Sequence, residues 1–314
     1  MSQDAPEAVL ITARNVLHDG QAARLLREAG MSVVEAAGGT ALHPDTARSV
    51  VAMVVGADLV DDRTVAAYPS LACILRAGSG TDNIRVAAGA GIAVEALPGL
   101  NAQSVADFTF GLILAASRRI AQADRLVRAG GWAGLPGGDV YRRTLGIVGL
   151  GSVGRAVAAR AAGFEMTVLA VQPSGAAPPG VRLVELDELL AESDAVTLHA
   201  PLTPQTRHMI GAQQLAVMRP HAVLVNAARG ELVDEFALID ALRRGVIAGA
   251  ALDVFEGEPR IRDEWRELEN VVLSPHSASY GDTTTKRLGT EVAAAVQRML
   301  ERHQVNHLER RNRR

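Results

Sequence analysis

The stretch that decides the fold is TLGIVGLGSVGRAVAARAAGF, residues 144–164. The apolar run Leu145–Leu150 predicts a buried parallel strand, and the alanine-rich run Val153–Ala162 predicts a helix directly after it. Glycines with the spacing G-x-G-x-x-G join the two, at Gly149, Gly151 and Gly154. Such glycines permit a tight turn and a close backbone approach to a pyrophosphate, which the first N–H groups of the helix can bind. The stretch therefore predicts a dinucleotide-binding turn.

The next predicted strand, MTVLAVQPS, lacks the acidic residue that usually follows this signature. An Asp or Glu about 20 residues on accepts hydrogen bonds from the adenosine ribose, and here the position is held by Gln172. A glutamine can still bond to the ribose, but it does not repel a 2′-phosphate. Because no Arg or Lys follows in QPSGAAPPG to bind that phosphate, we expect NAD as the cofactor, with NADP possible.

Three apolar runs further along the chain each lead into a charged or ionisable side chain. They are VLVNAARGELVDE with Arg229, GAALDVFEGEP with Glu258, and NVVLSPHSAS with His276. An open parallel sheet presents its chemistry in the turns that follow its strands. Three such turns after the nucleotide signature predict one active site.

In their order and spacing, these motifs resemble the D-isomer-specific 2-hydroxyacid dehydrogenases, with phosphoglycerate dehydrogenases the branch most similar in pattern. The similar segments are GLGSVG, HAPLTPQTRHMI, NAARGELVDE, ALDVFEGEP and SPH, preceded by RAGSGTDNI and LPGLNAQSVADF. The resemblance covers most of the chain. It implies an α/β fold of two Rossmann-like doubly wound parallel-sheet domains with an interdomain active-site cleft. It also implies NAD-dependent interconversion of a D-2-hydroxy acid and its 2-keto acid.

Reduction of a 2-keto acid needs a proton donor, because the carbonyl oxygen gains negative charge as the hydride arrives. The resemblance assigns that role to His276, with Glu258 favouring the protonated imidazole and holding one of its N–H groups. Arg229 offers a planar fork for the substrate carboxylate and can polarise the carbonyl. Each of these catalytic candidates has a structural alternative. His276 could be a loop histidine that is hydrogen-bonded to the backbone, and Glu258 a solvated carboxylate in a turn. Arg229 could cap a helix or form a salt bridge.

By the same resemblance, further residues bind the cofactor. Ser152 and Val153 would lie on the pyrophosphate turn, and Asp253 would accept a bond from the nicotinamide carboxamide. The expected cofactor residues also include Ala227, Ala228 and Ser279. The two alanines would lie beside the nicotinamide. As an alternative, Asp253 caps the end of its own strand.

The substrate residues expected from the resemblance lie upstream, at Arg76, Gly78, Ser79, Gly80 and Asn101. Backbone N–H groups of the loop 78–80 can bind a carboxylate, and the alternative is a plain turn in which Asp82 caps a following helix. Arg76 matches an arginine that phosphoglycerate dehydrogenases use near the substrate phosphate, but a second family arginine is replaced by Gly89. We therefore expect a small 2-hydroxy acid, with 3-phosphoglycerate one candidate.

Length and composition agree with two α/β domains, since 314 residues suit two cores of ordinary size. The formal net charge of −3 gives no electrostatic reason to expect a nucleic-acid or membrane partner. The lone Cys73 excludes an intrachain disulfide and a thiol metal cluster, and no metal is expected. With no apolar run near the length of a membrane span and no secretory signal pattern, we expect a cytoplasmic protein.

For the domain boundaries we expect a discontinuous substrate domain, 1–100 plus 283–314, and a nucleotide-binding domain, 101–282. Five strands are predicted in the first domain, and a long helix over 101–130 opens the second. A last helix over 288–303 would return to the first domain. The apolar run FTFGLILAA in the long helix, together with the resemblance, predicts a homodimer.

A different class of function stays open at this point. The chain also resembles the C-terminal-binding corepressors, which keep the same fold and the Arg/Glu/His set, and PHSASYGD has some similarity to their segment after the histidine. The alternative is therefore a dinucleotide-sensing interaction protein. Turnover of keto acids separates the two, because a sensor would bind NADH tightly and reduce little.

Overall fold

The computed structural model describes residues 7–87, 90–173 and 175–312. Contacts between Cα atoms divide the chain into two compact units. Unit 1 combines Met1–Asn101 with Tyr280–Arg314, and unit 2 is Ala102–Ser279. Gly89, where the sequence replaces a family arginine, lies outside the described residues.

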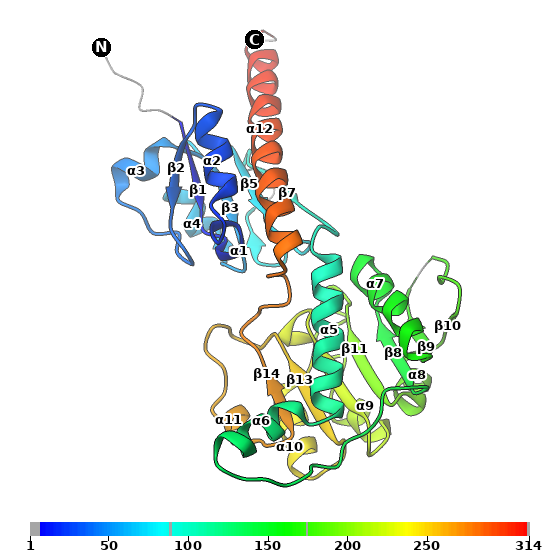
Figure 1. The fold of residues 1–314 in the computed structure, drawn as a ribbon. Coiled ribbons are helices and arrows are strands. Elements are labelled where there is room, and N and C mark those ends of the chain that lie inside the picture. The colour runs from blue at the N-terminus through cyan, green and yellow to red at the C-terminus, as the bar shows by residue number, and fades with distance from the viewer. Residues whose placement is uncertain (1–6, 88–89, 174, 313–314) are drawn as a thin grey trace. The chain divides into compact units, whose positions relative to one another are not determined.

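Unit 1 is built on a five-stranded parallel sheet in the order β2-β1-β3-β5-β7 (Figure 1). Its strands are β1 (Ala8–Ile11), β2 (Ser32–Glu35), β3 (Val50–Val55), β5 (Cys73–Arg76) and β7 (Ala93–Ala96). These correspond to the five strands predicted from the apolar runs. A separate two-stranded sheet pairs β4 (Val60–Asp61) with β6 (Ile84–Arg85).

Helices cover both faces of this sheet because alternate side chains of each strand point to opposite sides. Val9 and Ile11 of β1 pack with α2 (Gln21–Glu28) and α12 (Asp282–Asn312), while Ala8 and Leu10 pack in the core that contains Ala47. The other helices of the unit are α1 (Arg14–Leu17), α3 (Pro44–Ser49) and α4 (Asp62–Ala66). Figure 1 shows α12 alongside α2, so the end of the chain completes the core of its first hundred residues.

Unit 2 contains a seven-stranded sheet in the order β10-β9-β8-β11-β12-β13-β14, with all pairs parallel. The strands are β8 (Thr144–Val148), β9 (Thr167–Val171), β10 (Val181–Leu183), β11 (Ala195–Leu198), β12 (Val223–Asn226), β13 (Gly249–Leu252) and β14 (Val271–Leu273). The chain winds outward from β8 in one direction and then from β11 in the other. The fold is therefore a doubly wound α/β sheet whose direction reverses between β8 and β11.

Two cores lie on the two faces of this sheet. Val223 and Val225 of β12 pack with α5 (Ala102–Ser117) and α7 (Ser152–Ala161), whereas Leu224 packs with the helices on the other face. Those helices are α8 (Leu186–Glu192), α9 (Ala212–Val217) and α10 (Glu235–Arg243). The remaining elements are α6 (Ile120–Arg128), α11 (Glu264–Glu267), η1 (Ala162–Phe164) and η2 (Gly230–Leu232).

Three expectations about helices are wrong in detail. The helix expected over 101–130 is two helices, because Arg119 takes a left-handed conformation (φ 54°) between α5 and α6. The last helix begins at Asp282 rather than at 288. Asp82 is followed not by a helix but by β6, whose pairing with β4 holds Ile84–Arg85 extended.

Candidate active site

The last residues of six neighbouring strands of unit 2, β9, β8, β11, β12, β13 and β14, share one register. In order across the sheet they are Val171, Val148, Leu198, Asn226, Leu252 and Leu273. The turns that follow these strands therefore start side by side at the carboxyl edge of the sheet. Ligands of open α/β sheets bind at this edge, at the point where the strand order reverses.

Each glycine of the nucleotide signature has a different geometric role. Gly149 has φ 100°, and a Cβ there would lie 2.8 Å from the backbone of His199 and of Ala200. A Cβ on Gly154 would lie 2.0 Å from the carbonyl oxygen of Gly149, so the helix can approach the strand only without a side chain. A Cβ on Gly151 would meet no atom within 4 Å, which leaves its outer side open to a ligand.

The helix after this turn begins one residue earlier than expected, at Ser152, with Gly151 as its N-cap. No side chain among the described residues caps this end of α7. Val153, the next residue, packs partly against the core below. Open backbone N–H groups at the start of a ten-residue helix can bind a phosphate, so the turn fits a dinucleotide pyrophosphate.

The ribose end of the predicted cofactor site holds a cation that the sequence reasoning missed. Gln172 directly follows β9, as predicted, and leads into the loop before β10. Arg155, on the first turn of α7, reaches this loop, where its Nη2 donates to the carbonyl oxygen of Ala176 at 3.0 Å. The sequence pattern points only to residues downstream of Gln172 as phosphate ligands, whereas Arg155 lies upstream and the fold brings it to this loop.

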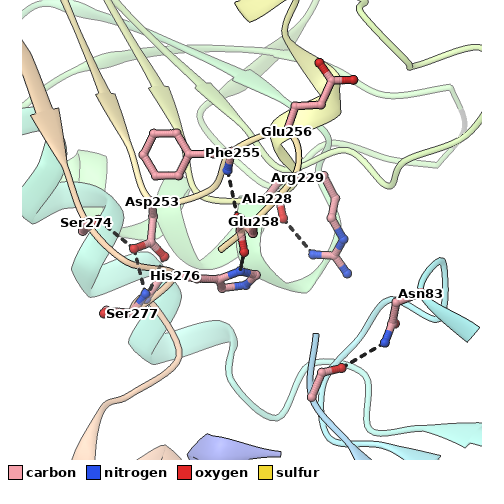
Figure 2. Close-up of polar contacts among 12 residues, drawn as sticks. Asn83, Ala228, Arg229, Asp253, Phe255, Glu256, Glu258, Ser274, His276 and Ser277 are labelled. Atoms are coloured by element: carbon pink, nitrogen blue, oxygen red, sulfur yellow. Dashed lines mark hydrogen bonds and ion pairs between the residues drawn. The ribbon is translucent and has the colours of Figure 1, made fainter. Parts of the chain in front are cut away.

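His276 and Glu258 lie in direct contact, with 2.7 Å between Nδ1 and Oε2 (Figure 2). The other carboxylate oxygen, Oε1, accepts the backbone N–H of Phe255 at 2.8 Å. Both side chains are partly exposed, at 34% and 26% of their surfaces, so solvent or a small molecule can reach the pair. A carboxylate on Nδ1 fixes the ring and leaves Nε2 for another partner.

Asp253 is fully buried and holds the loop that carries His276. Its carboxylate accepts bonds from the Ser274 hydroxyl (2.7 Å) and from the N–H groups of Ser277 (2.7 Å) and Ala278 (2.8 Å), as Figure 2 shows in part. Its carbonyl oxygen accepts the N–H of His276 at 2.8 Å. Asp253 therefore caps the end of its own strand, which is the alternative to cofactor binding that the sequence leaves open for this residue. Ser279, half-buried, follows this braced segment.

The Arg229 turn is shaped by two residues that the sequence reasoning did not single out. Asn226, almost fully buried, donates from Nδ2 to the carbonyl oxygen of Arg229 (2.8 Å) and accepts the N–H of Ala228 (3.1 Å). A Cβ on Gly230 would lie 2.1 Å from the carbonyl carbon of Phe255, so this turn and the Glu258 turn touch through their backbones. Arg229 Nη1 itself donates to the carbonyl oxygen of Ala228 at 2.7 Å, and half-buried Ala227 precedes them.

His199, the first residue after β11, lies beside the nucleotide turn. Burial lowers the pKa of its imidazole from the usual 6.5 to about 3, so the ring is neutral at physiological pH. Its ring Nε2 lies 3.0 Å from the Thr197 hydroxyl. The backbone N–H of His199 donates to the carbonyl oxygen of Val148 at 2.7 Å. This histidine adds no positive charge to the site.

The predicted substrate residues Arg76, Gly78, Ser79 and Gly80 belong to unit 1, at the carboxyl end of β5. Arg76 is largely buried, with Nε donating to Asn83 Oδ1 at 3.3 Å, and a Cβ on Gly78 would lie 2.7 Å from its Nη1. The Ser79 hydroxyl accepts the N–H of Gly99 at 3.3 Å. The guanidinium therefore packs under the loop 78–80, which keeps positive charge close to the loop's backbone.

Asn101 has a buried side-chain oxygen with no hydrogen-bond partner among the described residues. A buried acceptor without a partner is costly, and a ligand donor at this point would relieve the cost. Within the described ranges, no helix has the length and apolarity to cross a membrane, and no group of three potential metal ligands is present.

Comparison with known proteins identifies similar chains. Residues 110–278 match the model of the D-isomer specific 2-hydroxyacid dehydrogenase NAD-binding domain. A glyoxylate reductase of Korarchaeum cryptofilum is 47% identical over 75% of each chain. A D-3-phosphoglycerate dehydrogenase of Mycobacterium leprae is 42% identical over 78% of this chain but only 48% of its own. A D-lactate dehydrogenase of Aquifex aeolicus, solved with NAD and lactic acid, has a TM-score of 0.82, 26% identity and coverage of 95% and 96%.

Proposed function

The chain belongs to the D-isomer specific 2-hydroxyacid dehydrogenase family, and we propose that the turns after β12, β13 and β14 carry its catalytic groups. As a member of that family it is an NAD(P)-dependent oxidoreductase that interconverts a D-2-hydroxy acid and its 2-keto acid. Its fold, two units each with a parallel sheet covered by helices, is that of the family.

The contact between Glu258 and His276 is the observation that carries the proposed mechanism. A dinucleotide held through its pyrophosphate at the turn 149–154 would supply, from its reduced nicotinamide, the hydride for the carbonyl carbon of the substrate. His276 then gives its Nε2 proton to the carbonyl oxygen, while Glu258 on Nδ1 stabilises the charged ring before transfer. The guanidinium of Arg229 binds the substrate carboxylate and offsets negative charge on the carbonyl oxygen.

The geometry of the nucleotide turn supports the proposed cofactor residues. The pyrophosphate would bind the N–H groups that start α7 at Ser152 and Val153, with open Gly151 allowing close approach. Gln172 would bond to the ribose. Asp253 would act on the nicotinamide side chiefly by fixing the loop 274–278, since its carboxylate already accepts bonds from three groups of that loop.

For the substrate we propose a short 2-keto acid, with glyoxylate the first candidate. The relative at 47% identity is called a glyoxylate reductase and matches this chain over three quarters of both lengths. The phosphoglycerate relative favours 3-phosphohydroxypyruvate as a second candidate. Arg76 is the one predicted cation for a substrate phosphate, and a doubly charged group usually attracts more, so we rank the unphosphorylated acid first.

Roles of Arg76, the loop 78–80 and Asn101 in substrate binding stay predictions, as does the interdomain cleft. Arg76→Ala tests the first of these. If Arg76 serves a phosphate, the variant loses kcat/KM for 3-phosphohydroxypyruvate far more than for glyoxylate. Equal losses for the two acids would indicate a general carboxylate or structural role.

The experiment that tests the function is oxidation of NADH and of NADPH, followed at 340 nm, with a panel of 2-keto acids. The panel contains glyoxylate, hydroxypyruvate, pyruvate and 3-phosphohydroxypyruvate. We expect saturable turnover with at least the smallest acid. Tight NADH binding without turnover of any acid would contradict an enzymatic role and favour the dinucleotide-sensing alternative.

We also propose a homodimer, whose interface involves residues other than the apolar run of α5. The apolar run of α5 packs largely inside unit 2, where Phe110, Leu112 and Ile113 are buried. Burial of each such side chain contributes about 1.5–3 kcal/mol, so the run needs no second chain to explain it. In contrast, Ile120 and Val127 of α6 and the following Trp132 are more than half exposed.

An exposed apolar surface of this kind is typical of a subunit interface, and a second copy of the chain is its proposed partner. Sedimentation equilibrium should give twice the chain mass for the wild-type protein. Trp132→Ser should shift the equilibrium toward monomer, whereas Tyr280→Ser, on unit 1, should not. A wild-type monomer at micromolar concentration would contradict the proposal. The cytoplasmic location also stays a prediction, which the presence of a single cysteine supports.

A further inference from the structure

Glu235 is a buried carboxylate that the mechanism above does not use. It is the first residue of α10, after the N-cap Asp234, and only 3% of its surface is exposed. Carboxylates are rarely buried to this degree without paired partners. Both of its oxygens have one. Oε1 accepts the backbone N–H of Glu256 at 2.8 Å, and Oε2 accepts from Arg262 Nε at 3.2 Å.

These two partners lie on either side of Glu258 in the chain. Glu256 precedes Glu258 by two residues, and Arg262 follows it by four. The Glu235 carboxylate therefore holds both arms of the turn that carries Glu258. The chain between them has a fixed length, so fixing its two ends restricts where the Glu258 side chain can point.

The second arm is held by more than an ion pair. The Arg262 guanidinium lies over the ring of Phe236, 3.6 Å from its centre, in addition to its bond with Glu235. Phe236 is the neighbour of Glu235 on α10. One turn of that helix therefore binds the arginine through the Glu235 carboxylate and through the face of the Phe236 ring. Arg262 is two-thirds buried, which shields the pair from solvent.

The same carboxylate also joins two of the catalytic turns. Glu235 follows Arg229 by six residues, with η2 between them, and Gly230 in that segment packs against the backbone of Phe255. The N–H of Phe255 in turn donates to Glu258. A displacement of the Glu256–Arg262 segment would thus move Glu258 relative both to Arg229 and to His276.

We propose that Glu235 is a positioning residue for the reaction, which acts by holding the turn 256–262 so that Glu258 meets His276. The proposal rests on the roles given above to Glu258 and His276. Glu235 touches neither of them, and its effect passes through the backbone of Glu256 and through Arg262. Small displacements of catalytic groups can cost about 100-fold in rate, so removal of Glu235 should have a measurable kinetic effect.

The test compares Glu235→Ala and Glu235→Gln with a matched control, Glu267→Gln. Glu267 also pairs with an arginine of this region, Arg243 at 3.0 Å, but its side chain is 69% exposed and touches neither arm of the turn. Glu235→Gln keeps an acceptor for the Glu256 N–H and loses the charge that binds Arg262. We expect kcat to fall by about 10–100-fold in the alanine variant, less in the glutamine variant, and not in the control.

A spectroscopic readout separates positioning from general destabilisation. In protein labelled with nitrogen-15 histidine, the Nδ1 proton of His276 shared with Glu258 should give a downfield resonance in the wild type and in Glu267→Gln. It should be lost or shifted in Glu235→Ala and partly kept in Glu235→Gln. NADH binding, followed by fluorescence, should be little changed in all of these variants because the Gly149 turn is untouched.

An unchanged resonance together with wild-type kcat in Glu235→Ala would overturn the proposal. If Glu235→Ala fails to bind NADH, the His276 resonance and kcat of Glu235→Gln and Arg262→Met test the proposal instead. Failure of the proposed function has a different signature, since Glu258→Gln would then leave kcat and its pH profile unchanged. The histidine resonance still tests the position of Glu258 in that case, because it needs no turnover.

Discussion

The turns after β12, β13 and β14 and the turn after β9 start from the same edge of one sheet, but they are fixed to different degrees. In the first group, Glu258 and His276 meet at 2.7 Å, and the buried amide of Asn226 bridges the Arg229 turn. After β9, the loop that begins at Gln172 lies near the surface, where exposed Arg155 donates from Nη2 to the carbonyl oxygen of Ala176 at 3.0 Å. The groups proposed for the reaction are therefore held by contacts of the fold, whereas the proposed choice between cofactors involves surface groups such as Arg155.

Glycines in the two regions show the same difference. A Cβ on Gly230 would lie 2.1 Å from the backbone of Phe255, which cannot move aside without displacing the Glu258 turn. A Cβ on Gly175, in the loop after β9, would lie 2.6 Å from Nε2 of Gln172, the end of a flexible side chain. Sequence changes should therefore be tolerated in the ribose loop far better than in the catalytic turns.

The largest effect is expected from His276→Ala. The variant loses the proposed proton donor, so kcat should fall at least about 100-fold, the low end for general acid catalysis. NADH should still bind, because His276 lies outside the turn 149–154. Steady-state kinetics and NADH fluorescence titration measure the two quantities. A near-normal kcat would remove His276 from this role.

Arg229→Lys should have the next largest effect. Lysine keeps the charge but loses the two parallel bonds of a guanidinium to a carboxylate, so KM for the keto acid should rise and kcat should fall as well. We expect a combined loss in kcat/KM of about tenfold or more, the value of one strong interaction at 1.4 kcal/mol. Unchanged KM for every keto acid turned over would show that the carboxylate binds elsewhere.

A smaller effect is expected in the ribose loop. Wild-type enzyme should prefer NADH over NADPH modestly, and Gln172→Asp should sharpen the preference because a carboxylate bonds to the ribose and repels the 2′-phosphate. The ratio of kcat/KM for the two cofactors measures it. A strong wild-type preference for NADPH would contradict the NAD assignment. Arg155→Ala would then be expected to abolish that preference, since Arg155 already contacts this loop.

The smallest effect concerns stability in acid. The pKa of His199 is lowered from 6.5 to about 3 in the folded protein, so protons bind the unfolded chain more tightly between these values. The stability that His199 gives is complete above pH 6.5 and is lost as the pH falls toward 3. Between pH 7 and pH 5 the loss should be about 2 kcal/mol, at 1.36 kcal/mol for each pH unit below 6.5.

Urea unfolding at the two pH values measures that loss in the wild type and in His199→Gln, with exposed His18→Gln as the control. The loss should be smaller in His199→Gln and unchanged in His18→Gln. The same loss in all three proteins would show that another group dominates the acid response.

Sequence patterns predicted many of the strands, the nucleotide turn and the three catalytic candidates because each depends on local features. An apolar run that ends in a charged group can be recognised in the sequence without knowledge of the fold. The same holds for glycines at a fixed spacing. The contacts of Asn226, Gly230 and Glu235 were missed because they depend on segments that meet only in the folded sheet. Arg155 was missed for the same reason, since helix α7 brings it back to the loop after β9.

Errors in helix boundaries have a related cause. The run 101–129 contains no proline and a single glycine, Gly111, so nothing local marks the left-handed residue Arg119. Asp82 precedes residues that could start a helix, but pairing of β6 with β4 overrides that tendency. From the sequence alone, the apolar character of α5 predicts a subunit interface. Packing on the sheet of its own unit accounts for much of it.

The most direct test of the central claim, that Glu258 and His276 act as one proton-donating unit, is the pH dependence of kcat/KM for glyoxylate reduction in wild type and Glu258→Gln. Without the carboxylate the protonated imidazole is less favoured, so the limb at which activity falls with rising pH should move to lower pH. Superimposable profiles would show that Glu258 does not act on His276, and the account of the catalytic turns would be wrong.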